Sequence, residues 1–395
     1  MALLTSGMTT TKRNIVAYIL LFFYLLTSYA VVATFMPDAF IAAEYRSIVK
    51  LALNLNICFV IILGAFIIRK LDKSYFAYIA PLTLIALSLL LYVTDCIAQI
   101  AIAFMASTVF ALSVLVFFRY FWKHTNSVER ARLAGIIAFS VLPFFFVLDL
   151  LPGDSLSDIY FVMFWIALNL MILGIIFLLR TRPQIQHEPY RPNNNKVFEK
   201  SVIILYMIPW VLFTLINTTL AKDYPVITNS SFHILVGLQV IGANSGAILA
   251  GFLSDFHGRK IALALSLTLN GASTVIAGIF SSQAAFSAMF FTSGLAWGML
   301  FVLYFFVIFG DLSNEENSQK IYAIGLVPYF LSVGIGQIYQ PFLPVIVSLM
   351  VTCLALFLAI IPIIVAPELL VSDLKEKRKM ANYVKRIKKI QKDQG

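Results

Sequence analysis

The decapeptide GFLSDFHGRK, Gly251 to Lys260, gathers side chains that could make ionic contacts in an otherwise apolar chain. The protein is 61% hydrophobic and 12% charged, yet Asp255, Arg259 and Lys260 fall within six residues. A tight polar turn explains the glycines, which permit a bend, and the two cations, which are common beside membrane spans on the inner side. It leaves the Asp255 carboxylate unexplained, so the role of the stretch depends on where it lies.

Residues suited to catalysis or metal binding are not clustered elsewhere. An enzyme acting at a membrane face would need grouped Asp, His, Glu or metal ligands, and the nearest group is Asp149, Asp154 and Asp158. The three cysteines fall in or at the edge of apolar segments, at Cys58, Cys96 and Cys353. They indicate neither a disulfide framework nor a metal site. We therefore expect no enzymatic activity and no cofactor.

Charged residues are missing from the middle of the apolar segments, where a proton relay or ion site would need them. This absence disfavours carboxylate-based proton coupling. Asp149 is the nearest candidate, but it fits better with the other external acidic residues. Histidine is the residue type that can change charge near physiological pH, which makes His233 a second candidate, although a lone interfacial histidine is more often a polar contact.

The elements that position these residues are membrane helices. Crossing a hydrocarbon core of about 30 Å takes roughly 20 apolar residues, and the mean hydropathy of +0.91 is that of a membrane protein. Twelve segments qualify: 14–36, 48–68, 75–94, 97–118, 133–152, 160–180, 201–220, 232–253, 261–280, 284–309, 321–341 and 344–366. The first is too long for a signal peptide, so we expect it to be retained.

The distribution of Lys and Arg predicts the orientation. Of 29 such residues, 26 fall in alternate loops and in the two terminal segments, and three fall on the opposite side. Because basic residues accumulate on the cytoplasmic side, both termini are predicted to be cytoplasmic, in the plasma membrane. The net charge of +10 then reflects topology and lipid contact, and no nucleic-acid partner is expected.

With this topology the decapeptide lies in a short cytoplasmic loop between the eighth and ninth spans. There the pattern G-x-L-S-D-x-x-G-R-K resembles the loop signature of the major facilitator superfamily. The resemblance implies an all-α integral membrane protein with twelve transmembrane helices in two pseudo-symmetric six-helix bundles. It divides the chain into bundles at 1–180 and 201–366, a cytoplasmic linker at 181–200 and a tail at 367–395.

An internal repeat supports this division. Gly64 precedes Gly251 by 187 residues, and two cytoplasmic loops, 126–135 and 316–325, are 190 residues apart. The N-terminal copy of the signature, GAFIIRKLDK, is degenerate because Ile68 replaces the Asp. We therefore expect an asymmetric gate.

The resemblance also implies a role for the decapeptide. In the family the loop carboxylate lies near a helix N-terminus of the other half, and the contacts break when the cytoplasmic side opens. Asp255 would contact the start of the fifth helix, around Arg130, Arg132 and Gly135, and Glu129 is a candidate partner for Arg259. The predicted gating residues are Gly251, Asp255, Gly258, Arg259, Lys260, Glu129 and Arg130.

A solute cavity is expected between the halves, where the family uses the first, fourth, seventh and tenth helices. On the seventh, polar and aromatic residues recur at steps of 4, 4 and 3, so they share one face. The candidates are Tyr18, Tyr29, Gln99, Tyr206, Trp210, Thr214, Asn217, Ser293, Trp297 and Tyr304. Helix packing is an alternative role for each. As a set without fixed charge, they suggest a neutral or zwitterionic, partly apolar solute.

The predicted function is a secondary transporter that moves such a solute by alternating access, as a monomer in contact with membrane lipid. The alternative is a sensor or scaffold on a transporter fold that does not transport. From Ser372 the tail reads as a basic amphipathic helix at the anionic inner leaflet.

Overall fold

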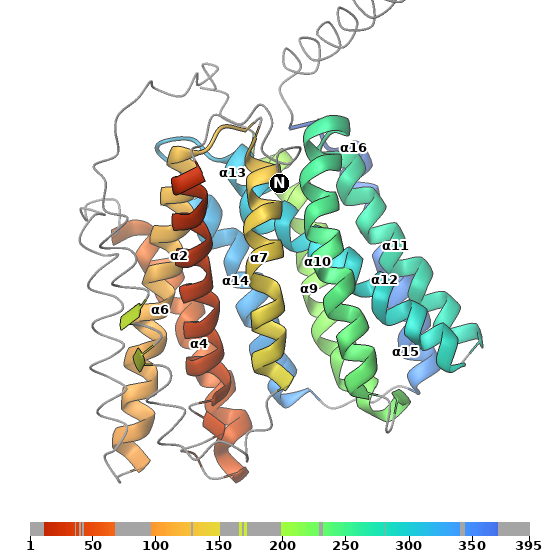
Figure 1. The fold of residues 1–395 in the computed structure, drawn as a ribbon, viewed down its shortest axis with the longest axis horizontal. Coiled ribbons are helices and arrows are strands. Elements are labelled where there is room, and N and C mark those ends of the chain that lie inside the picture. The colour runs from red at the N-terminus through yellow and green to blue at the C-terminus, as the bar shows by residue number, and fades with distance from the viewer. Residues whose placement is uncertain are drawn as a thin grey trace, which may run out of the picture.

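The computed structural model describes residues 12–35, 37–38, 41, 43–67, 96–127, 129–150, 166–167, 170–171, 199–228, 232–280, 282–339 and 344–369. The regular secondary structure of these residues is entirely helical. Among them, nine helices are long and apolar enough to cross a membrane. The helices stand side by side in an upright bundle (Figure 1). The predicted all-α membrane architecture is confirmed.

The helices follow the chain in two groups. The group before residue 181 contains α2 (Lys12–Ala30), its π-helical continuation η1 (Val31–Phe35), α4 (Ala43–Ile67), α6 (Cys96–His124) and α7 (Arg130–Leu150). The group after residue 198 contains α9 (Lys200–Thr228), α10 (Phe232–His257), α11 (Arg259–Phe280), α12 (Gln283–Phe301), the π-helical η4 (Val302–Ile308), α13 (Phe309–Leu312), α14 (Ser318–Ile338), α15 (Val345–Leu358) and α16 (Ile360–Val365). We call these groups the N-terminal and C-terminal halves.

Ten of the twelve predicted spans coincide with these helices, while the span 75–94 and most of 160–180 lie outside the described residues. The helices run further than the apolar segments. For example, α6 continues through Arg119 and Lys123, which were predicted to lie in a loop. Helical hydrogen bonding continues past the hydrocarbon core because it satisfies backbone groups wherever the chain stays regular. The linker, apart from 199–200, and the tail beyond Leu369 also lie outside the described residues.

The decapeptide was predicted to form a loop, but in the structure it is helical apart from Gly258. Asp255 lies in the last turn of α10, and only Gly258 separates α10 from α11. Gly258 has a φ of 109°, a left-handed conformation that glycine adopts without the steric cost of a side chain. The chain therefore reverses in one residue, which holds the signature side chains on helical backbone rather than on a flexible loop.

One end of the bundle holds most of the Lys and Arg residues that the structure describes. The last residues of α6, α10 and α13 and the first residues of α7, α11 and α14 lie there, uppermost in Figure 1. We call it the basic end, and the opposite end the far end. In the described helices, every Lys, Arg, Asp and Glu lies within eight residues of a helix terminus. The middle of the bundle is therefore uncharged in this part of the chain.

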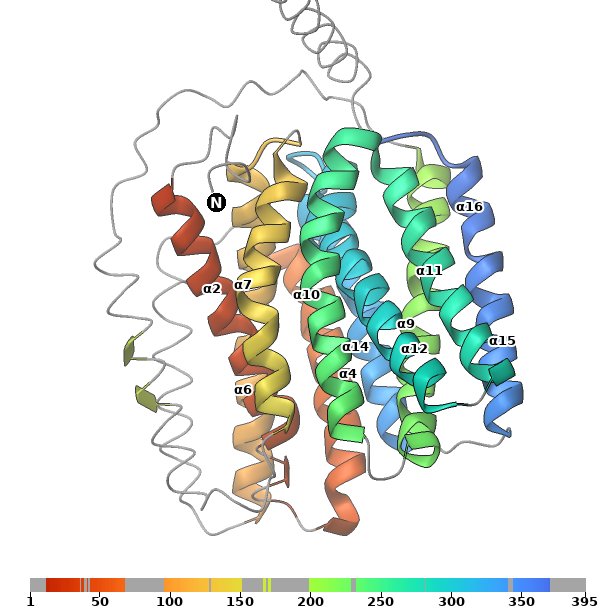
Figure 2. The ribbon, with the colours of Figure 1, turned by 45° about the vertical axis from the view of Figure 1, so that its right-hand side comes forward.

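Two helix pairs make the most extensive contacts between the halves. Helix α7 lies beside α10, and α4 packs against α14 (Figure 2). The α4–α14 seam runs from the contact of Lys320 with the Phe66 ring, 5.5 Å from its centroid, to the close approach of Gly334 and Asn54. Inside the C-terminal half, glycines at Gly246 and Gly298 bring α10 and α12 into backbone contact. These two helices therefore pack as one unit.

Candidate functional site

The candidate site lies where α7 of the N-terminal half packs against α10 of the C-terminal half. A Cβ added at Gly251 would lie 2.9 Å from the Ala131 carbonyl oxygen and 3.0 Å from the Arg132 Cα atom. A Cβ at Gly135 would lie 2.7 Å from the Ala247 carbonyl oxygen. The backbones of the two halves are thus in contact at the basic end, and only glycine allows this distance.

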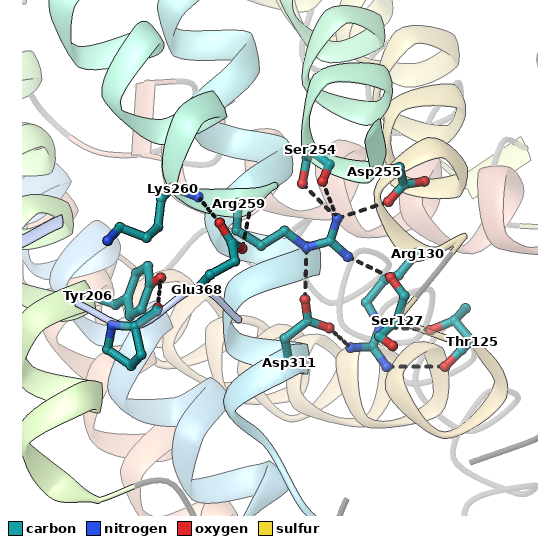
Figure 3. A network of polar contacts seen from close by, with 11 residues as sticks. Thr125, Ser127, Arg130, Tyr206, Ser254, Asp255, Arg259, Lys260, Asp311 and Glu368 are labelled. Atoms are coloured by element: carbon teal, nitrogen blue, oxygen red, sulfur yellow. Dashed lines mark hydrogen bonds and ion pairs between the residues drawn. The ribbon is translucent and has the colours of Figure 1, made fainter. Parts of the chain in front are cut away.

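Across this seam lies a row of five side chains of alternating charge, which we call the charge chain: Arg132, Asp255, Arg259, Asp311 and Arg130. The Nε atom of Arg132 bonds to Oδ2 of Asp255 at 3.0 Å, and Asp255 Oδ1 accepts from Nη1 of Arg259 at 2.9 Å. The Nε atom of Arg259 reaches Oδ2 of Asp311 at 2.9 Å. Asp311 Oδ1 then accepts from Nη1 of Arg130 at 2.6 Å. Figure 3 shows the part from Asp255 to Arg130.

The charge chain crosses between the halves at both of its ends. Arg130 and Arg132 belong to α7 of the N-terminal half, whereas the other three members belong to the C-terminal half. A third crossing is the hydrogen bond that Arg259 Nη2 donates to the Ser127 carbonyl oxygen. Each end therefore ties the start of α7 to the C-terminal half.

Local hydrogen bonds fix the orientation of the guanidinium groups. Arg259 Nη1 also donates to Oγ and the carbonyl oxygen of Ser254, at 2.9 and 2.8 Å. Arg130 donates to Oγ1 and the carbonyl oxygen of Thr125, each at 3.1 Å. Because these partners lie in the same half as each arginine, both guanidinium groups are positioned even before the halves meet.

Burial makes these contacts strong. The side chains of Asp255 and Arg259 have no exposed surface, and that of Arg132, the most exposed member, retains 9%. Charge-assisted hydrogen bonds of this kind are roughly twice as strong as neutral ones. Removing one partner of a buried ion pair typically costs about 3–5 kcal/mol, because the other charge stays buried without compensation.

A segment after α16 supports the start of α11. The carboxylate of Glu368 accepts from the backbone N–H groups of Arg259 at 2.9 Å and of Lys260 at 3.3 Å. These N–H groups have no partner within the helix, so Glu368 acts as an N-terminal cap from a distant segment (Figure 3). A Cβ at Gly258 would lie 2.6 Å from the Glu368 carboxylate, and Lys260 Nζ donates to the Ile364 carbonyl oxygen at 2.7 Å.

The predicted gating residues therefore gather at one place. Glu129 is buried just before α7, and the carboxylates of Asp255 and Asp311 pair with Arg259. Asp311 was not among the predicted residues. Its position just beyond the predicted tenth span, on the basic side, was the available signal, and α13 brings its carboxylate to the start of α11.

Several predicted cavity residues pack within the C-terminal half. Trp210 Nε1 donates to the Gly325 carbonyl oxygen at 2.7 Å, and its ring stacks on Tyr304 with centroids 4.6 Å apart. Tyr206 donates its hydroxyl to the Pro367 carbonyl oxygen at 2.7 Å. Thr214 is buried and bonds to the Val211 carbonyl oxygen within α9. These contacts favour the packing role for Tyr206 and Trp210.

The other candidates occupy different positions. Tyr18 and Tyr29 are buried on α2, and the hydroxyl of Tyr29 bonds to Asn54 Oδ1 at 3.2 Å. The Tyr29 ring meets Phe330 of the other half with centroids 5.4 Å apart. The rest lie on three helices: Gln99 near the start of α6, partly buried Asn217 on α9, and buried Ser293 and partly buried Trp297 on α12. Of these, Tyr29 directly contacts the opposite half.

Comparisons with solved structures identify the fold. The chain is similar to FucP, a Major Facilitator Superfamily transporter in its outward conformation, at 11% identity and a TM-score of 0.66, covering 90% of this chain and 98% of FucP. It is similar to a bacterial homologue of the iron transporter ferroportin in an outward-facing state, at 11% identity, a TM-score of 0.67 and coverages of 88% and 98%. The human organic anion transporter MFSD10 matches at 9% identity, a TM-score of 0.66 and coverages of 90% and 100%.

By sequence, the chain matches no protein-family model and no curated protein. The structural likeness nevertheless extends over nearly the whole length of each neighbour. The protein is therefore a multi-pass membrane protein with the major facilitator fold, as the signature in the decapeptide indicated.

Proposed function

We propose that the protein is a secondary transporter that moves a small neutral or zwitterionic solute by alternating access. The basic end is the cytoplasmic side, and the structure represents the state in which that side is closed. The observation that carries this proposal is the charge chain, because its ends join opposite halves of the fold. Residues placed only for stability within one half would not need to cross the seam.

Opening the basic end requires specific bonds to break. The pairs Arg132 with Asp255 and Arg130 with Asp311 join the halves and would separate. The pairs of Arg259 with both carboxylates lie within the C-terminal half and can persist. The separated faces then carry two positive charges on α7 and a net negative charge on the C-terminal half. Opposite charges favour reclosure, so the charge chain acts as a reversible latch.

The uncharged middle of the described bundle supports the solute class. A phosphorylated or dicarboxylate solute would need Arg or Lys near the midplane, where the described helices carry none. The neighbours do not select a solute, because they are described as a fucose:proton symporter, an iron transporter homologue and an organic anion transporter. Solute class therefore has to come from the residues of this chain and from direct measurement.

The first test identifies a ligand. Thermal unfolding of the purified protein is followed against neutral metabolites, zwitterions, carboxylates and hydrophobic drugs, because a ligand of the folded state raises its apparent stability. Uptake of the stabilising compound is then measured in proteoliposomes. A ligand that stabilises the protein but shows no flux would favour the sensor or scaffold alternative.

The second test links flux to the charge chain. Asp255→Asn and Asp311→Asn each leave a buried guanidinium without its full charge partner, so we expect transport to fall by about tenfold or more while membrane insertion is retained. Asp38→Asn is the matched control, because Asp38 pairs with Lys50 at 2.8 Å inside the N-terminal half. Wild-type flux in both charge-chain variants would contradict the latch.

A further inference from the structure

A second set of contacts between the halves lies deeper than the charge chain and is made by phenylalanine rings. Seven phenylalanine rings, which we call the phenylalanine layer, fill the space between α2, α6 and the segment of α12 and η4: Phe22, Phe117, Phe118, Phe121, Phe301, Phe305 and Phe306. None of these side chains is more than 6% exposed. The layer therefore excludes water where the halves meet.

Phe306 is the centre of this layer. Its ring lies 5.0 Å from Phe22, 5.1 Å from Phe121 and 5.3 Å from Phe118, centroid to centroid. The interplanar angles of 70°, 79° and 65° are those of the favourable edge-to-face arrangement. Phe306 belongs to the C-terminal half and these three partners belong to the N-terminal half, so this one side chain packs against three rings of the opposite half.

The phenylalanine layer lies next to the charge chain, on the side that faces the middle of the bundle. Phe306 precedes Asp311 by five residues on continuous helix, and Phe121 precedes Thr125 by four. At about 1.5 Å per residue, the two layers are separated by roughly 6–8 Å along the helices. A solute or water molecule leaving the middle of the bundle toward the basic end meets the rings first.

The two layers have different physical properties. Guanidinium and carboxylate groups attract water, and a row of them offers hydrogen-bond partners along its whole length. Phenylalanine rings offer no strong donor or acceptor, and hydrophobic constrictions can close a pathway by excluding water. Without the phenylalanine layer, water in the middle of the bundle would meet these polar groups directly.

We propose that the phenylalanine layer is the barrier to water and protons at the basic end, and that the charge chain is the latch that holds this barrier closed. The inference rests on the proposed alternating-access function, since it assigns separate tasks to two parts of the same gate. Phe306 and Phe22, one from each half, form its central contact.

The test measures proton entry without any solute. The full-length protein is reconstituted in liposomes that contain a pH-sensitive dye, the membrane potential is clamped with potassium and valinomycin, and the outside is acidified. We expect Phe306→Ala and Phe22→Ala each to raise the proton leak several-fold over wild type. Phe306→Leu, which keeps an apolar side chain, should restore most of the barrier.

Phe252→Ala is the matched control, because it removes a ring of equal size that stacks on Phe256 on α10, outside the layer. Wild-type leak in both Phe306→Ala and Phe22→Ala, with monodisperse folded protein, would overturn the proposal. If Phe306→Ala does not fold, Phe22→Ala decides the question.

Asp311→Asn distinguishes the role of the charge chain from that of the phenylalanine layer. Loss of the latch leaves the rings intact and opens them only part of the time, so Asp311→Asn should leak less than Phe306→Ala. A leak in Asp311→Asn that exceeds that of Phe306→Ala would place the barrier in the charge chain and overturn the assignment. Because the leak is measured without solute, a protein that fails to transport can still confirm or refute the barrier. Failure of the proposed function and failure of this inference are thus distinguishable.

Discussion

Gly251→Ala tests whether the close approach of α7 and α10 belongs to one of the two conformations that the proposed alternating-access function requires. The added Cβ would lie 2.9 Å from the Ala131 carbonyl oxygen and 3.0 Å from the Arg132 Cα atom. Ordinary contacts between such atoms begin near 3.5 Å, so the helices must move apart by about 0.5 Å. Both neighbours are backbone atoms and cannot rotate away. The substitution therefore destabilises the closed basic end and leaves the open state unaffected.

The size of the effect follows from the cost of overpacking. Inserting a methyl group into a well-packed contact typically costs about 1–3 kcal/mol. If that cost falls on the closed state alone, the ratio of open to closed molecules rises by roughly 5- to 150-fold. An increase of that size converts a minor open population into one that a distance measurement can detect.

Electron spin resonance between two labels provides the assay. Lys123 at the end of α6 and His257 at the end of α10 are exposed and lie in opposite halves at the basic end. With the three native cysteines replaced by serine, labels at these positions report the separation of the halves. We expect Gly251→Ala to shift the distance distribution toward longer values.

Gly237→Ala is the matched control, since it lies on the same helix and a Cβ there meets no atom within 4 Å. Both substitutions raise helix propensity by a similar amount, so this contribution cancels in the comparison. Identical distance distributions for the two variants would refute the idea that the α7–α10 contact is specific to the closed state.

Three further substitutions have defined outcomes. Glu368→Ala removes the cap from the Arg259 and Lys260 N–H groups, and should lower stability by about 0.5–2 kcal/mol in thermal unfolding. Gly246→Ala pushes a Cβ into the backbone of α12, and should sharply reduce the yield of monodisperse protein on size exclusion. Trp210→Phe removes the hydrogen bond to the Gly325 carbonyl oxygen, and should lower stability by about 0.5–1.5 kcal/mol, whereas unchanged unfolding would contradict the packing role.

Helices could be predicted from the sequence because the bilayer imposes a simple length and polarity requirement. Ten of the predicted spans coincide with helices in the described residues, with ends shifted by several residues. The ends differ because hydropathy marks the hydrocarbon core, whereas hydrogen bonding continues beyond it. The decapeptide shows the limit of this approach: its polarity suggested a loop, but the backbone is helical on both sides of Gly258.

The helical face of a residue could be predicted, but not the partner that it would meet. The step pattern predicts that Tyr206, Trp210 and Thr214 share one face of α9, and in the structure all three are buried. That face contacts α14, α16 and the segment of Tyr304, because buried indole and phenol groups require acceptors, and backbone carbonyls there supply them. Spacing along one helix carries no information about which neighbour satisfies its polar atoms.

Asp311 shows why the charge chain could be recognised only in the three-dimensional structure. It lies 52 residues from Arg259 and 181 from Arg130, so no local pattern connects it to either. Asp311 is also positioned by the π-helical η4, because the wider turn of η4 sets the direction of α13, which follows it and carries Asp311. The segment that presents Phe306 to the other half therefore also delivers Asp311 to the charge chain. A movement of this segment would act on the apolar and ionic contacts together, which is the coupling that a gate with two layers requires.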